Sequence, residues 1–371
     1  MADHLIWILP RKVRNFLVSA LGLASPRRSE MKAVVMRDYG GPDVLEVADL
    51  PMPSPRGGEI VIKVLAAGLN RLDHYLREGS VRRDLALPHV LGSDAVGEIV
   101  EIADDVTGFT LGDRVIPMPG YPLDAEDHFT PISAAPSYAI RGIIEHGAYA
   151  QYMRVPARWV VHDRTGLSPA EVAALPMALV TTVRALREVG RLKADETALI
   201  HAGASGTGIV AVQIAKAIGA RVIATVRTPE KGEAVLAAGA DAVVTTRTDW
   251  AETARALAGS TGIDLVLDNL GGTFLTESLS LLNPLGRLVS MGMVAGLEAT
   301  LPIRSLFFAQ QQILGTLMGD REDLEWGLEL VRAGKVRARV DQIYPLARAS
   351  EAHRRLAEAA QTGSIILDPW A

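Results

Sequence analysis

A glycine-rich turn between an apolar strand and a helix constrains this chain more than any other stretch. Residues 197–231 read TALIHAGASGTGIVAVQIAKAIGARVIATVRTPEK. Residues 198–200 predict a short buried strand, and apolar residues at helical spacing predict a helix over 206–218 that ends at Gly219. Residues 221–225 predict the next strand. The stretch therefore predicts a strand, a turn, a helix and a second strand.

The turn itself is built almost entirely from small residues. Small residues let the backbone approach a pyrophosphate closely, and the following helix offers that anion unpaired N–H groups and a partial positive charge. A turn in this context is typical of dinucleotide binding, although it could serve only to pack the helix on the strand. The predicted cofactor-binding residues of the turn are Ala202, Gly203, Ala204, Ser205, Gly206, Thr207 and Gly208.

The residues after the second strand indicate which dinucleotide is bound. NAD sites usually carry Asp or Glu there, which holds the ribose hydroxyls. This chain has Val226, Arg227 and Thr228, followed by Lys231, so two cations could pair with a 2′-phosphate and no carboxylate opposes it. We therefore expect NADPH rather than NADH, with solvated helix-start cations as the alternative. A nicotinamide site in turn suggests a cytoplasmic protein.

Composition sets the broad class of the protein. The 371 residues suffice for two domains, and 49% hydrophobic residues with a net charge of −5 predict a soluble globular protein with no nucleic-acid partner. The chain has no cysteine, which excludes disulfides and thiolate-bound metals. Residues 1–30 hold only short apolar runs, well below the roughly 20 residues of a membrane span. We expect a loose leader without membrane contact, although part of it could form an amphipathic helix.

The rest of the chain divides into two kinds of pattern. Short strands and turns over residues 31–160 predict a partly open antiparallel β-barrel, with an irregular lobe over 117–150. Strands alternate with helices over residues 161–308, which predicts a doubly wound parallel sheet covered on both faces. Residues 309–371 are expected to rejoin the first domain. The predicted class is therefore an α/β protein of two domains.

Several segments together resemble the medium-chain dehydrogenase/reductase superfamily, from Met31 to Pro369. The resemblance implies a GroES-like catalytic domain, split in sequence, around a Rossmann domain. The most similar branches are the zinc-free quinone oxidoreductases and their zinc-binding alcohol dehydrogenase relatives. The segments, besides the glycine-rich turn, are MKAVVMRDYGGPDVLEV, AAGLNRLDHYLREG, PHVLGSDAVGEIVEI, GFTLGDRV, GAYAQYMRVP and EAHRRLAE.

The positions that bind zinc in the zinc-dependent relatives carry other residues here. The resemblance places Asn70 where those relatives have Cys, and Ser93-Asp94 where they have His-Glu. It places Met177 where they have Cys or Asp. These three positions cannot form the tetrahedral N/S site that zinc prefers. The lobe that holds structural zinc in relatives corresponds to residues 120–138, which lack cysteine, so we expect no metal.

The loss of zinc changes which reaction is feasible. Zinc polarises a carbonyl or alkoxide, whereas a carbonyl-conjugated double bond or a quinone delocalises the incoming negative charge itself. We therefore expect NADPH-dependent hydride transfer to an activated C=C bond or quinone, on a small apolar carbonyl-conjugated substrate. A zinc-free ketone or alcohol oxidoreductase, a biosynthetic tailoring reductase and a non-catalytic NADPH-binding protein are the alternatives. We expect a homodimer.

The resemblance also assigns residues to the site. It places Asn70, Asp73 and Tyr75 by the nicotinamide. Asn70 and Tyr75 are the catalytic candidates, as hydrogen-bond or proton donors, with packing as the alternative. Asp73 is a substrate-pocket candidate that could instead brace a loop. The other substrate-pocket candidates are Ser93, Met177, Phe307 and Phe308, and the other cofactor-binding candidates are Thr181, Arg227, Lys231, Asn269, Ser290, Met291, Gly292, Leu317 and Met318.

Overall fold

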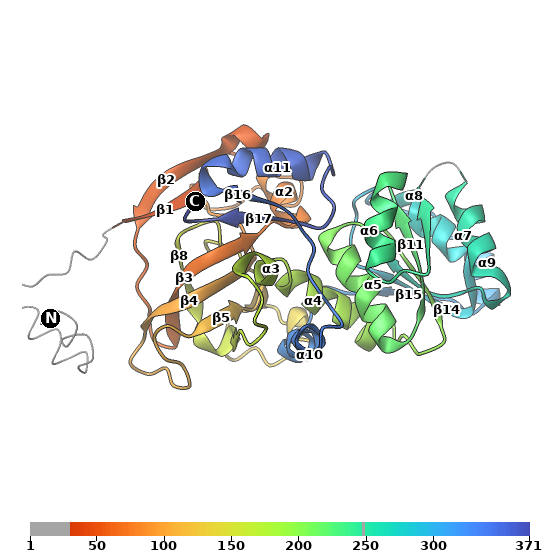
Figure 1. The fold of residues 1–371 in the computed structure, drawn as a ribbon, viewed down its shortest axis with the longest axis horizontal. Coiled ribbons are helices and arrows are strands. Elements are labelled where there is room, and N and C mark those ends of the chain that lie inside the picture. Colours follow the sequence, from red (N-terminus) through yellow and green to blue (C-terminus); the bar gives the residue numbers. More distant parts are fainter. Residues whose placement is uncertain (1–29, 247–248) are drawn as a thin grey trace, which may run out of the picture.

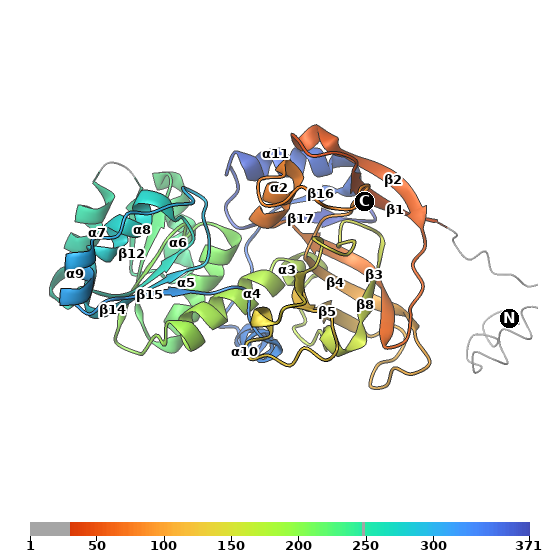
Figure 2. The same ribbon diagram turned by 180° about the vertical axis from the view of Figure 1, so that it is seen from behind.

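The computed structural model describes residues 30–246 and 249–371, which form two domains side by side (Figures 1 and 2). The leader expected at residues 1–30 lies outside the described part, apart from Glu30. One domain is built on a seven-stranded, largely antiparallel sheet and the other on a six-stranded parallel sheet. No described helix is long and apolar enough to cross a membrane.

The first domain is organised around β3 (Glu59–Gly68), the longest strand of its sheet. One edge of β3 pairs with β4, while the other edge pairs with β8 near its start and with β17 near its end. Strand β17 comes from the C-terminus, so the two separate segments of this domain meet on one strand. The remaining strands of the domain are β1 (Glu30–Met36), β2 (Leu45–Pro51), β4 (Asp94–Ile102), β5 (Arg114–Pro117), β6 (Gly120–Pro122), β7 (Tyr138–Ile140), β8 (Tyr152–Pro156), β9 (Val160–His162), β16 (Val340–Pro345) and β17 (Ser364–Asp368).

The helices of the first domain are short and lie beside its sheet. Helix α2 begins at Asn70, whose backbone N–H donates to the Asp73 carboxylate at 2.8 Å, as in a capping box. Helix α3 begins in the same way at Ser168, with Glu171 as the second residue of the box. The helices and single turns are α2 (Arg71–Glu78), α3 (Pro169–Ala173), α11 (Ala349–Ala357), η2 (Pro42–Val44), η3 (Ile132–Ala134), η4 (Ala157–Trp159) and η8 (Leu346–Arg348).

The second domain has the strand order β12-β11-β10-β13-β14-β15, with every pair parallel. The order reverses between β10 and β13, which creates a crevice at their carboxyl ends. Both faces are covered, because Ala198 and Ile200 of β10 pack in the core that contains α5, whereas Leu199 packs with α7 and α8. The strands are β10 (Thr197–Ile200), β11 (Arg221–Val226), β12 (Ala242–Thr245), β13 (Ile263–Asp268), β14 (Leu282–Ser290) and β15 (Gln312–Gly315).

The predicted helix over residues 206–218 coincides with α5 (Gly206–Ile218), and Gly219 ends it with φ of 104°. The α/β class and the two-domain GroES-like and Rossmann architecture are confirmed. Strand β15 lies past residue 308, where we expected the parallel sheet to end, and completes that sheet. The other helices and turns of this part are α4 (Pro176–Val183), η5 (Arg184–Val189), η6 (Pro229–Lys231), α6 (Gly232–Ala237), α7 (Trp250–Ala258), η7 (Gly259–Thr261), α8 (Gly272–Leu279), α9 (Ile303–Phe308) and α10 (Arg321–Arg332).

Candidate active site

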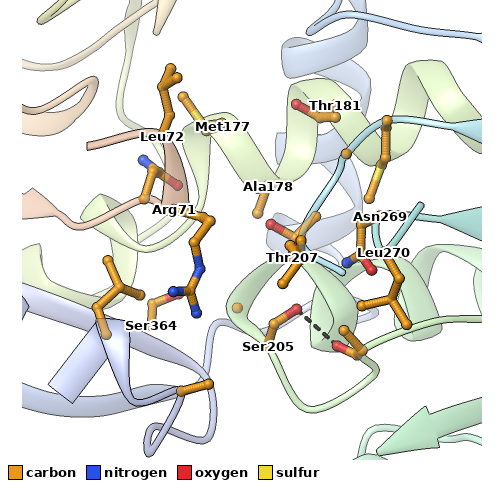
Figure 3. A pocket seen from close by; sticks show the side chains of 18 of the residues that line it. Arg71, Leu72, Met177, Ala178, Thr181, Ser205, Thr207, Asn269, Leu270 and Ser364 are labelled. Atoms are coloured by element: carbon orange, nitrogen blue, oxygen red, sulfur yellow. Dashed lines mark hydrogen bonds between the residues drawn. The ribbon is translucent and has the colours of Figure 1, made fainter. Parts of the chain in front are cut away.

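A cleft of about 850 Å³ lies between the two domains, at the carboxyl ends of the parallel strands. This volume is that of a cofactor or drug-sized ligand site, and the position is the crevice where open parallel sheets bind their ligands. The second domain contributes the glycine-rich turn and the ends of β11, β13, β14 and β15. The first domain contributes the start of α2, the loop before β17 and, together with α4, the other wall (Figure 3).

The glycine-rich turn forms the floor of the cleft. Ser205 caps α5, because its Oγ accepts the Gly208 N–H at 3.0 Å. A Cβ on Gly206 would lie 2.2 Å from Ser364 Oγ, and one on Gly208 would lie 2.2 Å from the Ala202 carbonyl oxygen. Glycine is therefore required at Gly208, where the close atom belongs to the backbone, whereas at Gly206 the close atom is a side-chain hydroxyl. The resulting helix N-terminus, open to the cleft, fits a pyrophosphate.

The ends of β13 and β15 present polar atoms that lack partners. Asp268 accepts the N–H groups of Leu270 and Gly271, at 2.9 and 3.1 Å from its Oδ1, and so holds the chain as it leaves β13. Beside it, the buried Oδ1 of Asn269 has no hydrogen-bond partner among the described residues, and neither has the buried Oγ1 of Thr316. Both residues line the cleft. Buried polar atoms are normally paired, so these two fit the hydroxyl and amide groups of a bound dinucleotide.

The start of α2 brings Asn70 to the cleft and fixes its amide. Asn70 Nδ2 donates to Asp94 Oδ2 at 3.0 Å, and the Met177 backbone N–H donates to Asp94 Oδ1 at 2.9 Å. Asp94 thus ties α2 to α4. Burial raises the pKa of Asp94 to about 7, partly offset by these hydrogen bonds. Tyr75 also lines the cleft, and burial raises its pKa, so its hydroxyl keeps its proton at neutral pH.

Four predicted substrate-pocket residues do not line the cleft, which corrects those assignments. Asp73 is fully buried and accepts hydrogen bonds from Asn70 N, Gly92 N and Tyr149 Oη, so it braces the loop. Ser93 is also buried, with its Oγ bonded to the Arg141 carbonyl. Phe307 and Phe308 lie on α9 with 60% and 68% of their surface exposed.

Most of the other predicted residues do line the cleft. Gly203 and Gly208 lie just behind its surface, where they permit the tight turn. The predicted residues that line the cleft are Asn70, Tyr75, Met177, Thr181, Ala202, Ala204, Ser205, Gly206, Thr207, Arg227, Lys231, Asn269, Ser290, Met291, Gly292, Leu317 and Met318.

Arg71 is the most informative cleft residue that the sequence reasoning missed. Its side chain extends from the start of α2 toward the glycine-rich turn (Figure 3). Burial lowers the pKa of Arg71, and the nearby Arg227 lowers it further. A half-buried guanidinium near a second cation favours an anionic ligand. The sequence signal for Arg71 as a cleft residue is its position directly after Asn70, in a segment assigned to the site. The other missed residues with polar side chains at the cleft include Asp94, Thr316 and Ser364.

The substrate end of the cleft is largely apolar. Figure 3 shows Leu72 and Met177 together above Arg71. The apolar side chains that line the cleft include Leu72, Val81, Ile140, Met177 and Leu317. An apolar wall with Asn70 and Tyr75 as its polar groups suits a small substrate that carries few hydrogen-bonding groups.

Comparison with known proteins assigns the chain to a family. A family model described as alcohol dehydrogenase GroES-like domain matches residues 56–165, and one described as zinc-binding dehydrogenase matches residues 206–333. Quinone oxidoreductase of Homo sapiens is 30% identical over 351 residues, which cover 91% of this chain and 97% of that protein. The chain belongs to the medium-chain dehydrogenase/reductase superfamily. The resemblance drawn from the sequence segments is therefore confirmed.

Other members of the superfamily show a range of activities. The 2-haloacrylate reductase of a Burkholderia species is 29% identical, covering 91% of this chain and 99% of that protein. A crystal structure of an NAD-dependent alcohol dehydrogenase superposes with a TM-score of 0.87 at 37% identity, covering 91% of this chain and 99% of that one. These findings establish an oxidoreductase of the medium-chain type, which binds a nicotinamide cofactor.

The positions of the superfamily's zinc ligands hold no metal-binding set in this chain. Asn70 and Asp94 are bonded to each other, and Ser93 is turned to a backbone carbonyl. Within residues 30–246 and 249–371, no group of three or more His, Asp and Glu side chains is arranged to hold a metal ion. The side chains present therefore do not fit the tetrahedral nitrogen and sulfur coordination of zinc.

Proposed function

We propose that this protein is a zinc-independent, NADPH-dependent oxidoreductase that transfers hydride to an activated C=C bond or to a quinone. The observation that carries the proposal is the pair of donors, Asn70 and Tyr75, at an apolar cleft end where zinc-dependent relatives have metal ligands. Bound nicotinamide supplies the hydride. The chain's own residues then have to orient the substrate and meet the negative charge that develops on its carbonyl oxygen.

Asn70 is suited to the second task. One N–H of its amide is held by Asp94 at 3.0 Å, which fixes the direction of the second N–H. That second N–H is available to a substrate oxygen. Tyr75 offers a hydroxyl that remains protonated, because burial raises its pKa. It can therefore donate a hydrogen bond, or a proton, to the enolate or quinol oxygen.

Two relatives favour this proposal, and one related structure favours its alternative. A quinone oxidoreductase and a 2-haloacrylate reductase, as their names state, act on a quinone and on a 2-haloacrylate, a compound that contains a conjugated C=C bond. The NAD-dependent alcohol dehydrogenase structure favours the second candidate, a zinc-free ketone or alcohol oxidoreductase that uses NADH. We rank it second because Asn70, Ser93 and Met177 offer no Lewis acid for an alkoxide.

A substrate panel tests the proposal. NADPH and NADH oxidation is measured with quinones, enones, simple ketones and, in the reverse direction, alcohols. We expect turnover with quinones or enones, faster with NADPH, and no change after treatment with a metal chelator. Turnover confined to ketones and alcohols would favour the second candidate. Tight NADPH binding without turnover on any substrate would indicate a non-catalytic cofactor-binding protein.

The cofactor preference is tested by Arg227→Ala. The charge-assisted contact to the 2′-phosphate is lost, so NADPH binding should weaken by about 1–3 kcal/mol, while NADH binding should change little. Calorimetric titration with each cofactor measures both values. Equal losses for the two cofactors would show that Arg227 does not recognise the 2′-phosphate.

The catalytic pair is tested by Asn70→Ala and Tyr75→Phe. Loss of one well-placed donor should lower kcat by about 10²–10³. NADPH affinity should stay within about threefold, because neither side chain is expected to contact the phosphates. Thr182→Val is a matched control, since Thr182 is fully buried on α4 and its hydroxyl donates to the Ala178 and Leu179 carbonyls of the same helix. Unchanged rates in both test variants would assign Asn70 and Tyr75 to packing.

We also propose that the protein is a homodimer. Strand β15 is an edge strand, and Phe307, Phe308, Ile313 and Leu317 are exposed beside it by 60%, 68%, 36% and 52%. An exposed apolar group at a sheet edge favours association. Light scattering should give about twice the 39.6 kDa of one chain, and Phe308→Glu should shift the mass toward the monomer. A monomeric wild-type protein would contradict this.

A further inference from the structure

The two cations assigned to the 2′-phosphate are already bonded to the other domain. Arg227 follows β11 and Lys231 ends η6, both in the second domain. Arg227 Nη2 donates to the carbonyl oxygens of Glu358 and Ala359, at 2.8 and 3.1 Å. Lys231 Nζ donates to those of Ala359 and Gln361, at 2.7 and 2.6 Å. These carbonyls belong to the loop that follows α11 in the first domain (Figure 1).

The loop is suited to accept hydrogen bonds from cationic side chains because it follows the C-terminal end of a helix. The last carbonyl groups of a helix have no partner within it and carry a partial negative charge. Ala359 takes a left-handed backbone conformation, with φ of 50°, directly after the helix end. Arg227 and Lys231 thus pair with the C-terminal end of α11. Burial lowers the pKa of Lys231 and the adjacent Arg227 lowers it further, whereas the charge of Asp341 raises it. Two adjacent cations favour a negative partner.

Asp341 on β16 anchors the two ends of the loop through hydrogen bonds. Asp341 Oδ1 accepts the Thr362 N–H at 2.9 Å, and its carboxylate receives two hydrogen bonds from Arg355 of α11, at 2.6 and 3.1 Å. Its side chain is 10% exposed. One carboxylate therefore fixes both the last turn of α11 and the backbone that follows the loop.

Arg227, Lys231, Ala359 and Gln361 all line the same cleft. A 2′-phosphate placed against the two cations would lie beside the carbonyl oxygens that now accept their N–H groups. Phosphate and carbonyl oxygens are both acceptors, and the partial negative charge of the carbonyl oxygens opposes the charge of the phosphate. The N–H groups of Arg227 Nη2 and two of the three on Lys231 Nζ are bonded to these carbonyls, so a 2′-phosphate can use those donors only in place of the loop.

We propose that the loop of residues 358–361 is a specificity-determining element of the cofactor site, because its carbonyl groups compete with the 2′-phosphate for Arg227 and Lys231. Asp341 is then a positioning residue that limits the preference for NADPH over NADH. The inference rests on the proposed use of Arg227 and Lys231 for the 2′-phosphate. It adds that NADPH, but not NADH, loosens this contact between the domains.

Calorimetry with two fragments of the cofactor tests the proposal without turnover. The probes are 2′,5′-ADP, which carries the 2′-phosphate, and 5′-AMP, which lacks it. Asp341→Ala should strengthen 2′,5′-ADP binding by about threefold to tenfold. This is the effect of weakening the contact between the cations and the loop carbonyls by about one net hydrogen bond. Binding of 5′-AMP should stay within about twofold. Asp341→Asn is the matched control, because it removes the charge that acts on Lys231 but keeps an oxygen that can accept the Thr362 N–H. It should give a smaller gain in 2′,5′-ADP binding than Asp341→Ala.

The outcomes separate this inference from the proposed function. If wild-type protein prefers 2′,5′-ADP, and Asp341→Ala leaves that preference unchanged or reduces it, the competition is absent and the NADPH assignment stands. If wild-type protein shows no preference for 2′,5′-ADP, both are wrong.

Hydrogen exchange on the wild-type chain keeps the test valid should Asp341→Ala fail to fold. Residues 358–363 should exchange faster with saturating 2′,5′-ADP than with 5′-AMP. The Gly363 N–H, which donates across the domains to the Ala204 carbonyl at 2.9 Å, lies in this segment. Equal or slower exchange with 2′,5′-ADP would overturn the proposal.

Discussion

The close contact between the glycine-rich turn and the loop before β17 is the constraint on which the site depends. Gly363 N–H donates to the Ala204 carbonyl at 2.9 Å, and Ser364 lies where any side chain on Gly206 would have to go. The turn would bind a dinucleotide poorly if it stood alone, because its helix N-terminus would face open water. The chain's C-terminal return encloses it, and the same strand, β17, completes the first domain on β3. The strand that completes the split domain is therefore preceded by the loop that encloses the cleft.

Local sequence was sufficient to predict the parts of the fold that depend on local chemistry. The turn, α5 and its end at Gly219 follow from small residues, apolar spacing and a glycine at a left-handed position. The architecture followed from the family resemblance and is confirmed. The sequence predicts a strand near residues 312–317 but not its partner; β15 pairs with β14, so the parallel sheet extends past residue 308.

The failures at the site have tertiary causes. Phe307 and Phe308 are apolar and close in sequence to cleft residues, but α9 points them outward, and no periodic pattern in six residues distinguishes the two directions. The environment of Asp73 is decided by Tyr149, which is 76 positions away and donates to it at 2.9 Å. Arg71 lies one position after Asn70, yet only the placement of α2 against the second domain shows that it enters the cleft. The sequence indicates Asp94 only as a position where relatives carry a metal ligand. That Asp94 holds the Asn70 amide is known only from the distance between the two side chains in the fold.

Those same contacts explain how a cleft of this family can work with its metal-ligand positions replaced. A buried carboxylate, Asp94, orients the Asn70 amide, and a protonated Tyr75 lines the same cleft. Neutral donors stabilise an enolate or quinolate, whose charge is already delocalised, better than they stabilise an alkoxide. In the proposed account, Arg227 and Lys231 hold the cofactor, whereas Asn70 and Tyr75 meet the substrate; all four residues line the same cleft.

Deuteride transfer tests the central claim most directly. The purified protein is given NADPH labelled with deuterium at the nicotinamide C4, together with an enone, and the product is analysed by NMR and mass spectrometry. The account predicts one deuterium on the β-carbon of a saturated ketone, with a solvent proton on the α-carbon. Deuterium on the carbinol carbon of an allylic alcohol would show C=O reduction and would contradict the account.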